Sequence, residues 1–150
     1  MANIGDKLQD FILKDQDNKH YNTADLRGKK ILLSFHPLAF TSVCANQMKS
    51  LEENAETFKQ LNTVPLGISI DQPFAKGAWA KELGIKNVRL LADFWPHGGV
   101  AKSLDLFREK EGSSMRANVI IDEQGKIIFI KIYDIPELPD IQEIIEFLKK

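Results

Sequence analysis

The chain has 150 residues, 43% of them hydrophobic and 27% charged, with 20 lysines and arginines against 21 aspartates and glutamates. This length fits one compact domain, and the net charge of −1 supplies no basic field to attract nucleic acid or anionic lipid. The N-terminus lacks the charged start and apolar run of a signal peptide, and no apolar stretch reaches the roughly 20 residues of a membrane span. We therefore expect residues 1–150 to form a single domain of a soluble, cytoplasmic protein with no nucleic-acid or membrane partner.

Strand and helix patterns alternate along the chain. Residues 30–36 are almost continuously apolar, which is typical of a strand buried on both faces, and Pro37 ends the run. From Thr41 to Phe58, apolar residues recur at steps of three and four, as on one face of a long amphipathic helix. Further strands are predicted at 11–13, 64–70 and 89–92, a hairpin at 118–122 and 126–130, and helices at 74–83, 100–104 and 140–149.

This order of elements predicts an α/β protein with a central mixed β-sheet flanked by helices. A βαβ beginning followed by an antiparallel hairpin is the arrangement of a thioredoxin-like fold, here with an N-terminal β extension at 11–13. In open sheets of this kind the reactive site lies beyond the carboxyl end of a strand, where a loop leads into a helix N-terminus. The segment 37–44 occupies such a position.

Cys44 is the single cysteine of the sequence. One thiol excludes an intramolecular disulfide, a Cys-x-x-Cys redox pair and a multi-thiolate zinc site. If Thr41 or Ser42 caps the helix, Cys44 lies in its first turn, where unpaired backbone N–H groups and the helix dipole favour a thiolate, the nucleophilic form. The alternative is a buried thiol that packs as a small hydrophobe in line with Met48 and Leu51.

Other classes of site find no support in the sequence. The three histidines, His20, His36 and His97, lie far apart and lack the i, i+3 or i, i+4 spacing of helical metal ligands. Neither a Gly-x-Ser-x-Gly elbow nor a phosphate-binding P-loop occurs. We expect neither a metal site nor a cofactor.

The segment 37–44, Pro-Leu-Ala-Phe-Thr-Ser-Val-Cys, resembles the Pro-x-x-x-Thr-x-x-Cys signature of the peroxiredoxins, thiol peroxidases built on the thioredoxin fold. Segments 25–30, 67–69, 91–93 and 116–122 are also similar to segments of that family, so the resemblance spans essentially the whole chain. It is strongest to the short bacterioferritin-comigratory-like and AhpE-like branches.

The resemblance implies a role for each residue of the motif. Cys44 is the nucleophile that attacks a peroxide and becomes a sulfenic acid. Thr41 hydrogen-bonds the thiolate and the peroxide, Pro37 shields the thiolate from water, and Arg116 stabilises the negative charge that develops as the O–O bond breaks. Gln47, one turn after Cys44, orients Arg116. Taken alone, the same residues also allow plainer roles: a helix cap, a strand end and a solvated surface charge.

The chain departs from the many relatives that carry a second, resolving cysteine. Lys49 stands at one position where relatives have it, and Ala75 lies in another such segment, where a natural alanine and a replaced cysteine read identically. The resemblance then implies a thiol-dependent peroxidase for hydrogen peroxide or organic hydroperoxides whose sulfenic acid is reduced by an external thiol or a thioredoxin- or glutaredoxin-like partner. The alternative is a thioredoxin-fold peroxide sensor, binding or chaperone-like module without turnover.

The resemblance further implies a homodimer, and the surface around Phe40, Trp79 and Trp95 is the candidate contact. His36 stands where relatives often carry an aromatic residue before the proline. We expect it to pack at the edge of the loop, with tuning of the site as the alternative.

Overall fold

The computed structural model describes residues 2–150. The strands are β1 (Ile12–Lys14), β2 (His20–Asn22), β3 (Lys30–Phe35), β4 (Thr63–Ser69), β5 (Arg89–Ala92), β6 (Phe107–Arg108), β7 (Ser113–Ser114), β8 (Arg116–Ile121) and β9 (Ile127–Tyr133). The helices are α1 (Ser42–Glu53), α2 (Ala55–Gln60), α3 (Pro73–Leu83), α4 (Gly99–Ser103) and α5 (Ile141–Leu148), with a 3₁₀ turn, η1, at Thr23–Leu26.

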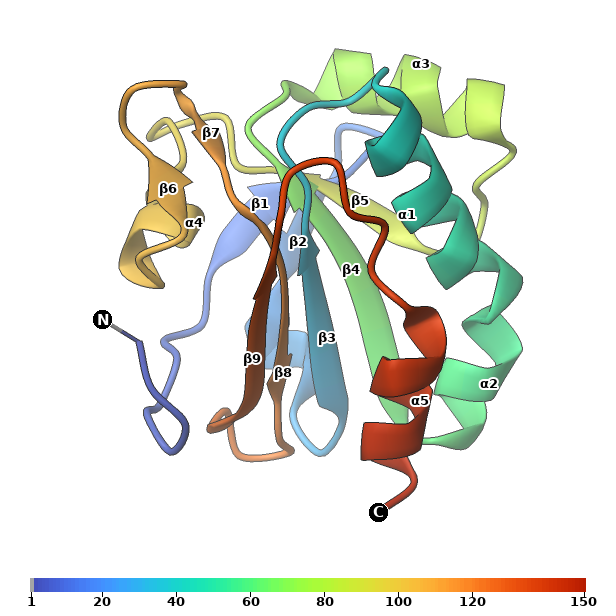
Figure 1. Ribbon diagram of the computed structural model, residues 1–150, viewed down its shortest axis with the longest axis vertical. Helices are drawn as coiled ribbons and strands as arrows, with labels where there is room; N and C mark the ends of the chain where they lie inside the picture. The colour runs from blue at the N-terminus through green and yellow to red at the C-terminus, as the bar shows by residue number, and fades with distance from the viewer. Residues whose placement is uncertain (1) are drawn as a thin grey trace.

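The central sheet of the described chain has the strand order β2-β1-β5-β4-β3-β8-β9. Strands β3, β4 and β5 run parallel, whereas β8 and β9 continue the sheet antiparallel on one side and β1 and β2 on the other. Helices α1, α2 and α5 cover one face, with α3 along its upper end, and α4 and the β6–β7 hairpin lie on the other side (Figure 1). The predicted thioredoxin-like α/β fold with a mixed central sheet is confirmed.

Strand β3 lies inside this sheet, between β4 and β8, and separates two hydrophobic cores. Ile31, Leu33 and Phe35 belong to the core that includes the α4 residues, while Leu32 belongs to the core beneath α1, α3 and α5. Side chains alternate between the faces of a strand, so a strand covered on both sides is apolar at nearly every position. Residues 30–36 are therefore apolar at almost every position because both faces of β3 are covered by a core.

One local prediction was wrong, and three short strands were missed. The single helix expected from Thr41 to Phe58 is divided at Asn54 into α1 and α2. Asn54 ends α1 because its Nδ2 donates to the Ser50 carbonyl oxygen and its backbone N–H to that of Leu51. The hairpin β6–β7 and strand β2 were not predicted, because strands of two or three residues are too short to show an alternating pattern.

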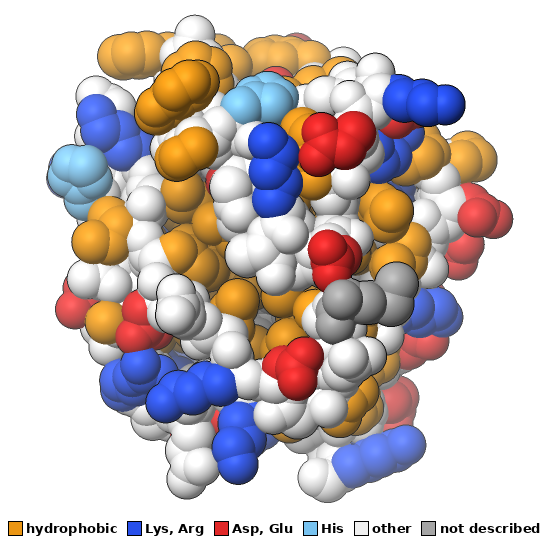
Figure 2. All heavy atoms as spheres, turned by 90° about the vertical axis from the view of Figure 1, so that its left-hand side faces the viewer, with side chains coloured by type: hydrophobic (Ala, Val, Ile, Leu, Met, Phe, Trp, Pro, Cys, Tyr) orange, Lys and Arg blue, Asp and Glu red, His pale blue; other side chains and the backbone are white. Residues whose placement is uncertain are grey.

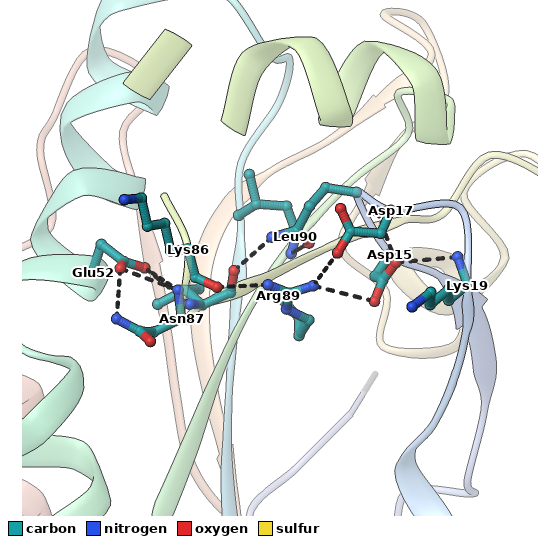
Figure 3. A network of polar contacts seen from close by, with 10 residues as sticks. Asp15, Asp17, Lys19, Glu52, Lys86, Asn87, Arg89 and Leu90 are labelled. Carbon is teal, nitrogen blue, oxygen red and sulfur yellow. Dashed lines mark hydrogen bonds and ion pairs between the residues drawn. The ribbon is translucent and has the colours of Figure 1, made fainter. Parts of the chain in front are cut away.

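A polar network fastens β5 to its neighbours (Figure 3). The Glu52 carboxylate of α1 accepts hydrogen bonds from the backbone N–H groups of Asn87 and Val88, just before β5. On the far side, Arg89 donates to Asp17 at 2.8 Å and lies 3.5 Å from Asp15, in the turn between β1 and β2. Helix α1 and the N-terminal hairpin are thus both tied to the edge of the parallel strands.

Within residues 2–150, no helix has the length and apolar character needed to cross a bilayer.

Candidate active site

The loop from Pro37 to Thr41 connects β3 to α1 and places Cys44 in the first turn of that helix. The cysteine side chain is only 1% exposed and packs with Ala39 and Met48. Phe40 has a φ of 66°, in the left-handed region, which turns the loop back towards the helix. The sulfur therefore lies at a helix N-terminus, where free backbone N–H groups favour negative charge.

Thr41 occupies the N-cap position of α1, but its side chain does not cap the helix. Its hydroxyl donates instead to the carbonyl oxygen of Leu38, at 2.8 Å, and so closes the loop. Of the two candidates for the N-cap, Thr41 and Ser42, Thr41 holds the position, without a side-chain hydrogen bond to the helix. The Thr41 hydroxyl keeps its lone pairs free to accept a hydrogen bond, because the bond to Leu38 uses only its proton.

Arg116 reaches Cys44 from β8, the strand next to β3. It is the first residue of β8, and its neighbour Ala117 pairs with Phe35, the last residue of β3. Its Nη1 donates to Sγ of Cys44 at 3.4 Å, and its Nε donates to the Ile135 carbonyl oxygen at 2.9 Å. A solvated surface charge is therefore the wrong description of this buried guanidinium.

Gln47 lies one turn after Cys44 and orients Arg116, as the resemblance implies. Its Oε1 accepts from Nη1 of Arg116 at 2.6 Å. Its Nε2 donates to Oγ of Ser34 at 2.7 Å and to the Phe35 carbonyl oxygen at 3.1 Å. These two acceptors on β3 fix which end of the amide faces the guanidinium, so Ser34 belongs to the site although no sequence pattern singled it out.

The four residues that the motif and the resemblance single out meet around one open pocket of about 330 Å³. The pocket is lined by Pro37, Leu38, Thr41, Ser42, Val43, Cys44, Arg108, Arg116, Ile135 and Pro136.

Arg108 was missed by sequence reasoning. Arg108 lies on β6 and lines the pocket. The sequence around it contains no motif that indicates this position. Its Nη2 donates to Oγ of Ser113, and its buried Nε has no partner among the described residues. The pocket thus contains a second guanidinium beside that of Arg116.

His36 lies directly after β3, at the start of the loop, and is wholly buried. Its Nε2 lies 2.8 Å from Nζ of Lys76, a lysine of α3 that is itself 0% exposed, and its ring is 5.3 Å from that of Trp79. Burial, then the positive charge of Lys76, keeps the pKa of His36 well below its ordinary value. The imidazole is neutral at neutral pH, and nothing in the sequence marked Lys76 as its partner.

Of the two tryptophans in the predicted dimer contact, only Trp95 lies on the surface. Trp79 is buried beneath Phe40, with ring centroids 6.2 Å apart, whereas Trp95 is 79% exposed. Trp95 lines a shallow groove of about 640 Å³ together with the exposed side chains of Phe74 and Phe94. Figure 2 shows hydrophobic side chains gathered at the upper left of the face that it displays.

Among residues 2–150, no group of three or more histidine, cysteine, aspartate or glutamate side chains is placed to hold a metal ion. The chemistry available is that of one thiol at a helix N-terminus, a guanidinium in contact with it and a hydroxyl at the pocket wall. Such a set can hold a thiolate and stabilise an oxygen that gains negative charge.

Comparison with known proteins agrees with this chemistry. Residues 4–130 match the AhpC/TSA family. The chain is 34% identical over 141 residues to alkyl hydroperoxide reductase E of Mycobacterium tuberculosis, covering 93% of this chain and 92% of that protein. It is 36% identical over 148 residues to peroxiredoxin-2 of Rattus norvegicus, covering 90% and 72%.

The fold agrees as well. The crystal structure of AhpC from Enterococcus faecalis aligns with 99% of this chain and 92% of its own, with a TM-score of 0.91 and 26% sequence identity. The sequence match and the fold together establish that this chain belongs to the AhpC/TSA family and is a peroxiredoxin.

Proposed function

We propose that this thiol peroxidase reduces hydrogen peroxide or organic hydroperoxides through the Cys44 thiolate. The sulfur attacks the terminal peroxide oxygen, so that an S–O bond forms as the O–O bond breaks. The sulfur supplies two electrons and becomes a sulfenic acid, and the departing oxygen takes up one proton to leave as water or an alcohol. The observation that carries this proposal is the 3.4 Å contact between Nη1 of Arg116 and Sγ of Cys44 at a helix N-terminus.

Three further residues have proposed roles in this step. Arg116 holds the thiolate and stabilises the charge that develops on the departing oxygen. The Thr41 hydroxyl, which donates its own proton to Leu38, accepts a hydrogen bond from the incoming peroxide and aligns it with the sulfur. Pro37 is buried at the base of the pocket and keeps bulk water from the thiolate.

The reductant is proposed to be an external thiol or a thioredoxin- or glutaredoxin-like protein. The sequence holds no second cysteine that could form a disulfide with Cys44. Since Cys44 is almost completely buried, the first turn of α1 must open before a protein thiol reaches the sulfenic acid. A sensor, binding or chaperone-like module without turnover is not favoured, because the relatives are named as a hydroperoxide reductase and a peroxiredoxin.

A homodimer is proposed as the assembly. The groove beside Trp95 exposes large apolar side chains at one end of the molecule, and patches of this kind commonly mark interaction sites. Phe40, in the loop of the active site, is also exposed.

Intact-mass analysis tests the peroxidase step. The reduced protein is mixed with one equivalent of hydrogen peroxide and a sulfenic-acid trap, and the wild type is compared with Thr41→Val and Arg116→Ala. We expect rapid trapping on Cys44 and a rate that falls by about two orders of magnitude or more in Arg116→Ala. Oxidation of the wild type no faster than that of a free thiol, with no effect of either substitution, would contradict the proposal.

A further inference from the structure

Lys76 is an unusual residue for the interior of a protein of this size. Its side chain is 0% exposed, and within the described chain no carboxylate lies within salt-bridge distance of its Nζ. A buried ammonium without a paired carboxylate is costly, so a hydrophobic residue of the same volume would give a more stable fold. Perturbed groups of this kind cluster at functional sites.

The His36 ring is the group that holds Lys76. Since the lysine ammonium has only donors, Nε2 of His36 must accept the 2.8 Å hydrogen bond, and the ring proton then lies on Nδ1. Nδ1 faces the Ser34 carbonyl oxygen at 3.4 Å, on the strand that leads into the active-site loop. The Trp79 ring closes the site from above, with its centroid 5.6 Å from Nζ.

Trp79, whose ring lies beside Lys76, belongs to the same hydrophobic cluster as Cys44. Burial lowers the pKa of Lys76 to about 7, and the negative charges of Asp71 and Cys44 oppose this effect. Asp71 is engaged elsewhere, because its Oδ2 accepts from the Ala39 backbone N–H and from Oγ of Ser69. On the far side of His36, Arg116 adds a further positive charge.

Arg116, which contacts Cys44, and Lys76, which contacts His36 and Trp79, come from different parts of the fold. Arg116 comes from β8, next to β3 on one side, while Lys76 comes from α3, which follows β4 on the other side. If a thiolate favours the charged form of Lys76, the charged lysine favours the thiolate by the same free energy, because linkage between two sites is reciprocal.

We propose that Lys76 is a positioning residue for the reaction of Cys44: its ammonium group, held on the His36 ring, supplies a second buried positive charge that keeps the sulfur as a thiolate. The lysine does not touch the peroxide, since it is fully buried and is not among the residues that line the pocket. Lys76 acts by stabilising the negative charge of the sulfur, and this proposal rests on the proposed function, in which Cys44 is the nucleophile.

Alkylation of Cys44 by iodoacetamide, followed between pH 4.5 and 9.5, tests the role of Lys76 without any peroxide. Lys76→Met removes the charge and keeps an apolar chain of similar length. We expect the midpoint of the rate profile to rise by about one pH unit, a tenfold change in the ratio of thiolate to thiol, with the alkaline plateau unchanged. Lys81→Met, on the exposed face of α3, is the matched control and leaves the midpoint in place.

His36→Phe gives an independent reading, because it removes the acceptor that holds the ammonium and should raise the midpoint in the same direction. A folded Lys76→Met protein, shown by circular dichroism, with an unmoved midpoint overturns the role of Lys76. Should that variant fail to fold, an unmoved midpoint in His36→Phe overturns it. Peroxide trapping on Cys44 is measured in parallel, so loss of the lysine effect and loss of peroxidase activity are distinguished.

Discussion

The side-chain carbonyl of Gln47 accepts a 2.6 Å hydrogen bond from Nη1 of Arg116, the nitrogen that also donates to the sulfur of Cys44. The amide of Gln47 is fixed in turn by two acceptors on β3. The guanidinium therefore cannot turn away from the thiolate without breaking a chain of buried hydrogen bonds that begins in the sheet.

Replacement of Gln47 by methionine should slow the oxidation of Cys44 by peroxide about tenfold or more, because the guanidinium loses the acceptor that holds it at the sulfur. Stopped-flow measurement of intrinsic tryptophan fluorescence during a single turnover gives the rate. Gln60→Met, on the exposed end of α2, is the control and should react like the wild type. Equal rates in the two variants would show that Arg116 needs no help from Gln47.

Lys76→Met should stabilise the reduced protein at pH 7, and its advantage should shrink as the pH rises. The folded-state pKa of Lys76 is lowered to about 7 from 10.5, so between these values the unfolded chain binds more protons than the folded one. Wild-type stability then rises with pH by up to about 1.4 kcal/mol per pH unit, and the variant lacks this slope. Urea denaturation at pH 7, 8 and 9 measures the free energy of unfolding of the wild type and of Lys76→Met. If the two free energies change with pH in the same way, the folded-state pKa of Lys76 is not lowered to about 7.

Glu52→Gln should cost about 1 kcal/mol of stability at pH 7, because the carboxylate loses its charge-assisted bonds to the backbone of Asn87 and Val88. Although its partial burial opposes this, these N–H donors lower the pKa of Glu52. Its contribution is therefore complete above its ordinary pKa of 4.5 and is lost as the pH falls below that value. Thermal melts at pH 7 and pH 3 measure the difference, and Glu53→Gln, with an exposed side chain, should show none.

Gly67→Ala should destabilise the fold by about 1–3 kcal/mol. A Cβ at this position of β4 would come within 2.3 Å of Sδ of Met48 and 2.9 Å of Cδ2 of Leu90, both buried. Gly99→Ala is the control, because a Cβ there makes only ordinary contacts at 3.8 Å or more, with Pro96. Chemical denaturation of both variants decides the matter, and equal stability would mean that Met48 moves aside without cost.

Trp95→Arg should convert the proposed dimer into a monomer, since it places a charge in the apolar groove that Phe74 and Phe94 also line. Sedimentation velocity across a range of protein concentrations measures the assembly. Lys110→Glu, an exposed position outside that groove, should leave the assembly unchanged. A wild-type protein that sediments as a monomer at all concentrations would refute the dimer.

Much of the site could be predicted because its main parts have local signatures. A continuous apolar run, a proline and a threonine before the first helical turn locate Cys44. A lone arginine has no such signature, and Arg116 was assigned because segment 116–122 is similar to a segment of the peroxiredoxins. Lys76 and His36 could not be paired in this way, because they are 40 residues apart and a helix surface and a strand end meet only in the folded chain. Arg108 was missed for a similar reason, since two-residue strands leave no periodicity to detect.

The sulfur and its guanidinium are separated by 72 residues of sequence. A nascent chain that has been synthesised only as far as β5 already contains the nucleophile, its helix and the parallel strands beneath it, but it lacks the strand that delivers Arg116. The thiol is therefore synthesised 72 residues before Arg116, which supplies the activating charge in the proposed mechanism. In the proposed mechanism, therefore, Cys44 gains its reactivity towards oxidants only when β8 pairs with β3.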